Sequence, residues 1–480
     1  MFDIAEAAVE GALAAGASYA DARAMIQASE GLGARNGVLE RMSQNESAGV
    51  GVRALIGSSW GFFATPDPSI EAARNAGHEA AAIAKASAVV AGPPMELADV
   101  GAAQDHWESQ CQEHPFEVAL SERGDLLVDV TATMKAVAGV GVASGHMHAW
   151  DTKKWFVSSQ GHRISQHLVE CGTSIEATAV GESETQRRSY GGIGGIWGTQ
   201  GYEIVRAADL LGNAQRVGEE AVELLSAPEC PSGVTDLILG REQLALQIHE
   251  SVGHAIELDR ILGWEAAFAG TSFLDLDQLG TLKYGSELMN ITADATLPGA
   301  LGSFGYDDEG TPSQRVDIVK DGIWVGVLSG RDSAHVAGLP PGGMVRSDGW
   351  NRLPMVRMTN VGLVPGESSL EEIIAATDDG IYMETNRSWS IDDKRLNFQF
   401  GCERGYEVKN GKLGRLLRNP TYTGITPQFW ASLDMLGGRD EWVFWGTPNC
   451  GKGQPQQYGH TGHPAVPGRF RGVRVGVRSK

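Results

Sequence analysis

One short motif constrains this 480-residue chain more than any other feature: two histidines five positions apart, the first followed directly by a glutamate. The motif, HESVGH at residues 249–254, lies in a segment whose apolar spacing is typical of a helix. Five residues of a regular α-helix turn through about 140°, so the two imidazoles would point to different sides. A widened turn of the π type brings them into line, and Gly253 lowers the cost of that distortion. We therefore predict a helix that bulges or kinks between Ser251 and His254.

The residue types of the motif suit a hydrolytic metal site. Neutral imidazole is a good zinc ligand, and a catalytic zinc keeps one position open for water. The metal makes that water acidic enough to supply hydroxide near neutral pH, and an adjacent carboxylate can pass the proton to a leaving amine. His249 and His254 are therefore candidate metal ligands, and Glu250 is a candidate general base. The alternative interpretation is an amphipathic helix with two incidental histidines.

Two histidines leave a zinc site one protein ligand short. Candidates for the third ligand lie in NCGKGQPQQYGHTGHP, residues 449–464. An ionised Cys450 is a softer and stronger zinc ligand than a carboxylate, whereas His460 and His463 form an H-x-x-H pair that could compete with it. The residues alone leave this choice open, because a lone cysteine beside glycine is usually an inert small apolar residue.

Composition narrows the classes of partner and compartment. A net charge of −21 argues against binding to nucleic acid or to anionic membranes, since both need a basic surface. The five cysteines are far apart and form no C-x-x-C pair, which fits a reducing compartment. The sequence has no apolar run of 18 residues that would predict a membrane span, and its start lacks the basic residues of a signal peptide. We expect a cytoplasmic protein.

The first half of the chain predicts helices alternating with strands. The expected helices cover residues 3–15, 69–87, 116–137 and 202–226, and the expected strands cover 19–29, 46–56, 58–65, 142–150, 155–159, 167–172 and 174–180, with a hairpin turn at 151–154. The glycine-rich segment 189–201 could suggest a phosphate cradle, but no Lys-Ser/Thr follows it. A mobile loop near the active cleft is the better interpretation.

The second half predicts many short strands broken by Gly, Pro and Asp-Gly. The expected strands cover residues 314–320, 323–328, 380–385, 388–392, 397–403, 405–409 and 412–417, and the expected helices cover 368–376 and 427–436. We predict an α+β fold with an N-terminal α/β domain, residues 1–226, and a β-rich, antiparallel domain, residues 227–480, which begins with a long helix carrying the motif. The acidic run 307–309 is expected to form a turn, and His146, His148 and His335 lie outside any ligand pattern.

Several segments resemble one known family. HESVGHAIELD (249–259), FGYDDEGTPSQ (304–314), RMTN (357–360), CGKGQP (450–455), AAGASYADAR (14–23) and GVGVRALIGSSWGFFAT (49–65) are similar to the TldD/PmbA family of metallopeptidases. The resemblance implies an α/β N-terminal half, a β-rich C-terminal half, and a zinc-dependent peptidase of unfolded or small peptides. It also implies that His249, His254 and Cys450 bind the metal and that Glu250 is the general base. Some members have G-K-x-G-Q after the cysteine, where this chain has GKGQ.

The resemblance extends to partners and leaves alternatives open. The family often pairs a TldD-type subunit, which carries H-E-x-x-x-H, with a PmbA-type subunit that lacks it. This chain resembles the TldD-type subunit, which leaves a homodimer and a heterodimer with a PmbA-type paralogue both open. Family members are linked to removal of leader segments from peptides. The alternative functions are a non-catalytic modulator that binds peptides or proteins, against which the intact motif argues, and a zinc hydrolase of non-peptide amides.

Overall fold

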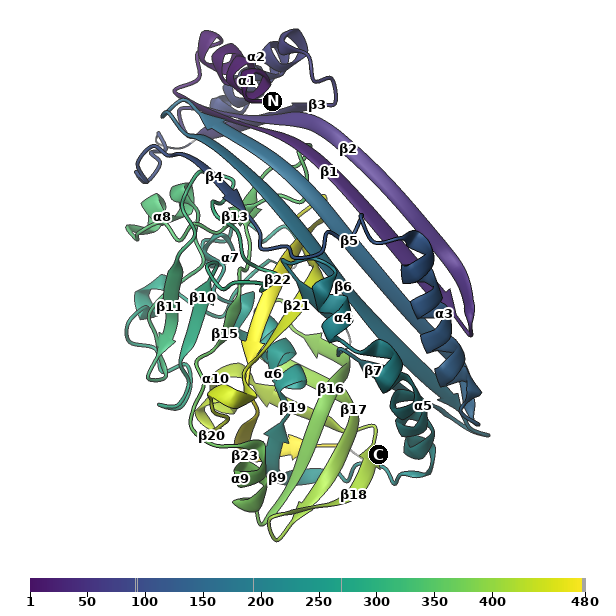
Figure 1. The fold of residues 1–480 in the computed structure, drawn as a ribbon. Coiled ribbons are helices and arrows are strands. Elements are labelled where there is room, and N and C mark those ends of the chain that lie inside the picture. Colours follow the sequence, from purple (N-terminus) through teal and green to yellow (C-terminus); the bar gives the residue numbers. More distant parts are fainter. Residues whose placement is uncertain (91, 93, 193, 269, 477–480) are drawn as a thin grey trace.

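The structure is a computed structural model that describes residues 1–90, 92, 94–192, 194–268 and 270–476. Its first half is built on one sheet in the order β3-β2-β1-β5-β6-β4. Four very long strands run diagonally across Figure 1: β1 (Tyr19–Arg35), β2 (Val38–Ile56), β5 (Val140–Ser158) and β6 (Arg163–Val180). The shorter strands are β3 (Ser59–Thr65), β4 (Gln104–Glu108), β7 (Thr185–Tyr190) and β8 (Ile196–Gly198), the last two paired with β6.

These strands run further than the sequence predicted. The hairpin expected at residues 151–154 is wrong, because β5 continues through it with Thr152 opposite Gln27 of β1 and Leu168 of β6. Two paired neighbours satisfy the backbone on both edges, so the polar DTKK run can remain a strand. β6 is likewise one strand rather than two. β1 and β2 meet at the two-residue turn Asn36-Gly37, where both residues have positive φ, 51° and 80°, as a type I′ hairpin turn requires.

Two pairs of helices cover the same face of the long sheet. α1 (Phe2–Ala14) and α2 (Ile70–Ser87) pack on even-numbered residues at one end of β1, while α3 (Leu120–Ala136) and α5 (Leu210–Ser226) pack at the other end. Side chains alternate along a strand, so the odd-numbered residues of β1 point toward the C-terminal half. The single helix expected over residues 202–226 is wrong: α4 (Glu203–Ala207) is separated from α5 by Asp209, which has φ 44° and caps α5 by accepting from the Gly212 amide.

The C-terminal half contains a sheet in the order β16-β9-β23-β19-β17-β18, in which β16 also pairs with β17, so that five of the strands form a closed ring. Its strands are β9 (Gly233–Leu239), β16 (Asp379–Ile391), β17 (Asn397–Lys409), β18 (Lys412–Arg418), β19 (Thr421–Ile425), β20 (Leu433–Leu436) and β23 (Gly468–Val475). A second sheet joins β12 (Ile323–Trp324), β11 (Arg315–Lys320), β10 (Ile291–Asp294) and β15 (Val361–Leu363). The smaller pairs are β13 (Val345–Arg346) with β14 (Met355–Val356), and β21 (Val443–Lys452) with β22 (Gln457–Ala465).

The fold is α+β, as predicted, with corrections in the second half. This half begins with strand β9 rather than a long helix, because the helical turns of the motif start only at α6 (Arg241–Ile248) and end at Gly253. α10 (Thr426–Ala431) stops before β20, so the helix expected over 427–436 is half strand. The remaining helices are α7 (Leu258–Ile261), α8 (Arg331–Ala337) and α9 (Leu370–Ala375). Among the described residues no helix is long and apolar enough to cross a membrane. The division at 226/227 stays a proposal.

Candidate metal centre

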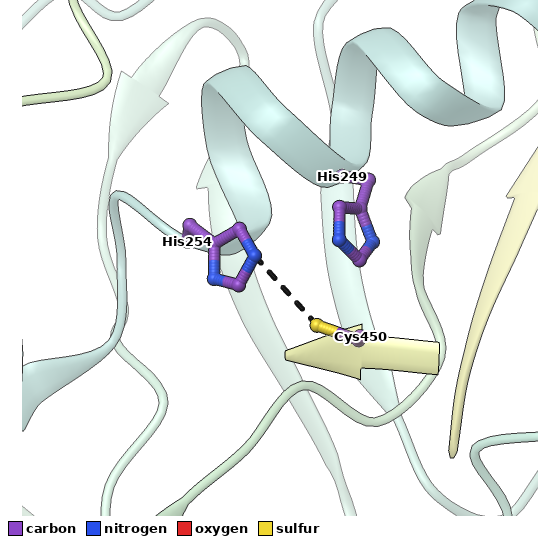
Figure 2. A group of neighbouring side chains, drawn as sticks. All are labelled: His249, His254 and Cys450. Carbon is purple, nitrogen blue, oxygen red and sulfur yellow. Dashed lines mark hydrogen bonds between the residues drawn. The ribbon is translucent and has the colours of Figure 1, made fainter. Parts of the chain in front are cut away.

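Three side chains that are distant in the sequence meet in the C-terminal half. His249 and His254 come from the helical motif and Cys450 from strand β21, as Figure 2 shows. One ligand atom from each lies within 4.8 Å of the other two, and the Cys450 Sγ is 3.6 Å from the His254 Nε2. All three residues are buried. The structure therefore brings together the two motif histidines and the cysteine that were candidate ligands.

A π-type turn aligns the two histidines. Residues His249–Gly253 form a π-helix, in which the His254 amide donates to the His249 carbonyl at 3.2 Å. The predicted distortion is thus confirmed. Gly253 has a further reason to be glycine: a Cβ there would lie 2.1 Å from the Met358 Sδ, so a larger residue would push into a buried side chain. Close packing against Met358 is therefore a second reason for glycine at this position, beside the flexibility of its backbone.

Hydrogen bonds select the metal-binding tautomer of His249. The Val361 carbonyl can only accept, so the His463 Nδ1, 2.9 Å away, carries a proton and donates it. The pKa of His463 is well below its usual value, first because of burial, so the ring is neutral and its Nε2 accepts. The His249 Nδ1 lies 2.7 Å from that Nε2 and donates to it. This leaves the His249 Nε2 lone pair free for a metal.

A carboxylate performs the same task for His254. Glu257 Oε2 lies 3.0 Å from the His254 Nδ1 and accepts its proton, which leaves the Nε2 lone pair pointing toward Cys450. Burial raises the pKa of Glu257, but the charges of Lys452, His254 and Arg260 lower it well below its usual value. Lys452 Nζ also forms a 2.7 Å ion pair with Asp259. The residue that orients His254 is therefore held in a buried ionic cluster.

The Cys450 thiol is placed where it can ionise. Burial raises its pKa, but the neighbouring His254 and Arg357 outweigh this and lower the pKa below the usual value for a thiol. Arg357 also donates through Nη2 to the Cys450 carbonyl. Since the thiolate is the form that binds zinc, this environment suits a ligand.

Glu250 lies beside these ligands with a partner that the sequence did not predict. Arg395 Nη1 forms a 2.8 Å ion pair with Glu250 Oε2. Arg395 belongs to the turn between β16 and β17 and has φ 63°, a left-handed conformation that is uncommon for arginine. Only the fold places this side chain next to the motif, 145 residues away in the sequence.

A cavity of about 350 Å³ opens onto the three candidate ligands and Glu250. Four glycines of the segment 189–201 line it, at positions 191, 192, 194 and 195, together with Trp389 and Trp445. The predicted position of this segment near the cleft is confirmed, and its mobility stays a prediction. Residue 193 lies outside the described residues. Strand β8 lies inside this segment, between its glycines and α4, so the glycines do not lead directly into a helix N-terminus as those of a phosphate-binding loop do.

The other sequence candidates have structural partners. His463 supports His249 as described, and His460 Nδ1 pairs with Glu170 at 2.9 Å, so neither joins the cluster. The acidic run 307–309 does form a turn, in which the Asp307 carboxylate accepts from the amides of Glu309 and Thr311. The same run is buried and binds the first half of the chain. Asp308 pairs with Arg23 and Lys154, and Glu309 pairs with Arg53.

Comparison with known proteins identifies the family. The chain matches three family models: PmbA/TldA metallopeptidase domain 1 over residues 20–84, the central domain over 113–227, and the C-terminal domain over 232–476. The chain belongs to the PmbA/TldD metallopeptidase family. A metalloprotease of Methanocaldococcus jannaschii is 30% identical over 410 residues, which cover 85% of this chain and 86% of that protein. A zinc metalloprotease TldD homolog of Saccharolobus solfataricus is 25% identical over 236 residues, covering 49% and 50%.

Solved structures agree with the fold. A candidate modulator of a DNA gyrase from Thermotoga maritima superposes with a TM-score of 0.77 at 17% identity, covering 98% of this chain and 99% of that one. TldE from Thermococcus kodakarensis superposes with a TM-score of 0.69 at 15% identity, covering 99% and 100%. At these identities the likeness supports the α+β architecture of this PmbA/TldD protein and nothing finer.

Proposed function

We propose that this chain is a zinc-dependent metallopeptidase that hydrolyses unfolded or small peptides, with removal of leader segments as one such reaction. One observation carries the proposal. Two imidazole nitrogens with fixed lone pairs and an acidified thiol converge within 4.8 Å beside a carboxylate, in a cavity open to a ligand. The names of the relatives as metalloproteases support the same reaction class.

The donor set fits zinc. Two neutral imidazoles and a thiolate are ligands that zinc prefers, and three protein ligands leave a position for water or substrate. The buried partners of the two rings strengthen the fit, since ligating histidines usually donate their other N–H to a carboxylate or another acceptor. When bound, zinc would supply Lewis acidity toward a carbonyl oxygen and lower the pKa of water.

Side chains of the protein would transfer the protons and orient the groups that react. Glu250 takes a proton from the attacking water and gives it to the leaving amine, as a general base and then a general acid. Arg395 holds the Glu250 carboxylate in one orientation before substrate enters. The Arg395 guanidinium occupies one oxygen of the Glu250 carboxylate. We propose that, when the water is in place, Arg395 either moves away from that oxygen or binds it together with the water.

The protein would recognise peptides mainly through hydrogen bonds to the peptide backbone. Within the described part of the chain, β21 pairs in a sheet with β22 alone, and its residues 445–447 and 449–451 line the catalytic cavity. A strand with one open edge can add an extended peptide by main-chain hydrogen bonds, which tolerates many side chains. A library of unrelated unfolded peptides tests this, and cleavage confined to one side-chain pattern would contradict it.

The deciding experiment combines metal analysis with turnover. We expect the purified protein to contain about one zinc per chain, to lose peptide cleavage in EDTA and to regain it with zinc. The Glu250→Gln variant should keep its zinc and lose cleavage. A correctly folded protein that takes up no zinc, or a Glu250→Gln variant with wild-type turnover, would contradict the proposal.

The state of assembly is part of the same experiment. We propose a homodimer or a heterodimer with a PmbA-type paralogue, and the mass in solution, measured with and without that paralogue, separates the two. All five cysteines are free thiols, and a thiolate ligand needs a reducing environment, which supports the expected cytoplasmic location.

One observation favours a second candidate function, a non-catalytic modulator that binds peptides or proteins. The Arg395 ion pair ties up the only carboxylate of the motif, and a binding protein has no use for a free general base. Zinc uptake with tight peptide binding, but without cleavage in the presence of any paralogue, would favour this function over the peptidase.

A further inference from the structure

A second cavity, larger than the one at the metal centre, lies between the long sheet and the C-terminal half. Its volume is about 420 Å³. One wall is the face of β1, β5 and β6 that is turned away from the helices. The other consists of residues 303, 304, 306, 346–348 and 357 and of the β21–β22 hairpin. Asn449 lines both cavities and directly precedes Cys450. A peptide bound at the metal centre could therefore extend into this second cavity.

The walls of this cavity carry more cationic than anionic side chains, although the protein is acidic. Three cationic side chains, those of Lys154, Arg346 and Arg357, face two carboxylates, whereas the whole chain has a net charge of −21. Both carboxylates have other partners: Glu170 lies 2.9 Å from the His460 Nδ1, and Asp348 accepts from the Tyr458 amide at 2.9 Å and lies 3.7 Å from Arg352. Lys154 is paired with Asp308. Arg346 and Arg357 are therefore the two cations of the wall that are candidates to bind an anion.

Arg357 and Arg346 differ in exposure. Arg357 is 2% exposed and donates to the carbonyls of Cys450 and Gln457, whereas Arg346 is half-buried. Arg346 donates through Nη2 to the carbonyls of Met358 and His460 and stacks on Phe304. The Nε of each arginine is buried without a hydrogen-bond partner in the described residues, and Arg346 forms no ion pair with a carboxylate of those residues.

A purely structural role explains only part of this arrangement. The two carbonyl bonds of Arg346 hold β13 near Met358 and near β22, which a neutral amide could also do. They leave the guanidinium without an ion-pair partner among the described residues. Burial and repulsion from Arg357 lower the pKa of Arg346 and the more distant charges of Glu170 and Asp308 raise it, which gives a pKa of about 10, so the group is still cationic at neutral pH. A half-buried guanidinium in a roomy cavity is stabilised by an incoming anion.

We propose that this cavity is a subsite that binds a carboxylate of the peptide substrate through Arg346. The inference rests on the proposed peptidase function and deepens it, because it names the chemistry of the part of the peptide that extends past Asn449. The apolar walls, Trp150, Leu168 and Phe304, suit the aliphatic part of an acidic side chain or of a C-terminal residue. Both sources present the same group, and the experiment separates them.

Binding is measured in the Glu250→Gln background, so that the peptides are not cleaved during the measurement. Three fluorescent peptides of one sequence are compared by anisotropy: Gln at the test position with an amidated C-terminus, Glu at that position with an amidated C-terminus, and Gln with a free C-terminus. The test position is moved along the peptide. We expect one carboxylate-bearing series to bind about tenfold to a hundredfold more tightly than the neutral peptide, as for a hydrogen bond to a charged group.

Variants assign the preference to Arg346. Arg346→Gln should abolish it to within about twofold while binding the neutral peptide as before, and Arg346→Lys should keep part of it. If Arg346→Gln does not fold, Tyr458→Glu decides: this side chain is exposed, lines the cavity, and would place a competing carboxylate at the subsite. Tyr458→Glu should weaken the carboxylate peptide by at least about fivefold and leave the neutral one nearly unchanged.

Equal binding of all three peptides, or a preference that survives in both variants, would overturn the inference. Failure of the proposed function looks different. A wild-type protein that binds carboxylate peptides selectively but neither takes up zinc nor cleaves them would refute the peptidase and leave the subsite standing. Cleavage without any carboxylate preference would refute the subsite alone.

Discussion

The tautomer of His249 depends on one neighbour, and removing that neighbour tests the account of the metal centre. In His463→Leu the His249 Nδ1–H loses the acceptor that lies 2.7 Å away. The ring then has no reason to keep its proton on Nδ1, and a buried donor is left unsatisfied at a cost of about 1–3 kcal/mol. Loss of such a partner typically lowers metal affinity about tenfold to a hundredfold, which corresponds to about 1.4–2.7 kcal/mol.

His463→Gln is the matched control. The amide oxygen of glutamine can accept from the His249 Nδ1, and its NH₂ can donate to the Val361 carbonyl that His463 now contacts at 2.9 Å. Zinc affinity is measured by competition with a chromophoric chelator, and the melting temperature of the metal-free protein is measured alongside. We expect a weakening of ten- to a hundredfold for leucine and of less than about fivefold for glutamine.

Three outcomes are informative. If His463→Leu binds zinc as tightly as wild type, the chain of hydrogen bonds from Val361 to His249 does not select the ligand tautomer. If leucine and glutamine weaken zinc equally, volume rather than hydrogen bonding matters at this position. If both melt far below wild type without metal, His463 acts on the fold, and the affinity change cannot be assigned to the tautomer.

Three further predictions follow from single contacts. Glu250→Gln should retain zinc and lower kcat for peptide cleavage by about a hundredfold or more, measured with metal content as the control. Gly253→Ala should lower stability by about 1–3 kcal/mol, because the added Cβ would lie 2.1 Å from the Met358 Sδ; chemical denaturation checks this, and the loss should be smaller when Gly253→Ala is made in the Met358→Ala background. Asp308→Asn should cost about 3–5 kcal/mol at pH 7, since it leaves two buried cations unpaired. Burial raises the pKa of Asp308, but its two cationic partners lower it well below the usual value, so this stabilisation is present above the unfolded pKa of about 3.9 and is lost as pH falls below it. The gap between wild type and variant should therefore shrink below about pH 4, and a constant gap would contradict the assignment.

Local geometry explains which features could be predicted from the sequence. The π-turn followed from the five-residue spacing alone, because a fixed rotation per residue allows few ways for two side chains to meet. The helix expected over residues 368–376 is α9, and its start is set locally, because the Ser369 side chain accepts from the amide of Glu372, three residues on. The full length of the long strands could not be predicted from the sequence. Residues 151–154 look like a turn by composition, and only pairing with β1 and β6 keeps them extended.

Interactions across the fold account for what the sequence could not indicate. Arg395, His463 and Arg346 are ordinary residues in their own segments and gain their roles only from neighbours about 100 residues or more away. A weak signal did exist for the contact between the two halves. Arg23 and Arg53 lie in stretches of mostly small and apolar residues, and a buried charge requires a partner. Asp21 is one partner of Arg53, and the acidic run 307–309 supplies the others.

The same ionic cluster that orients His254 also fixes the strand that carries Cys450. Lys452, two residues after the cysteine, forms a 2.7 Å ion pair with Asp259 and lies 3.4 Å from Glu257, the acceptor of the His254 proton. A displacement of β21 would therefore disturb an imidazole as well as remove a thiol. Two of the ligands are thus coupled through buried charges, and the third is fixed separately through His463. A site held in this way needs little rearrangement on binding a metal, which favours both affinity and a constant position for Glu250.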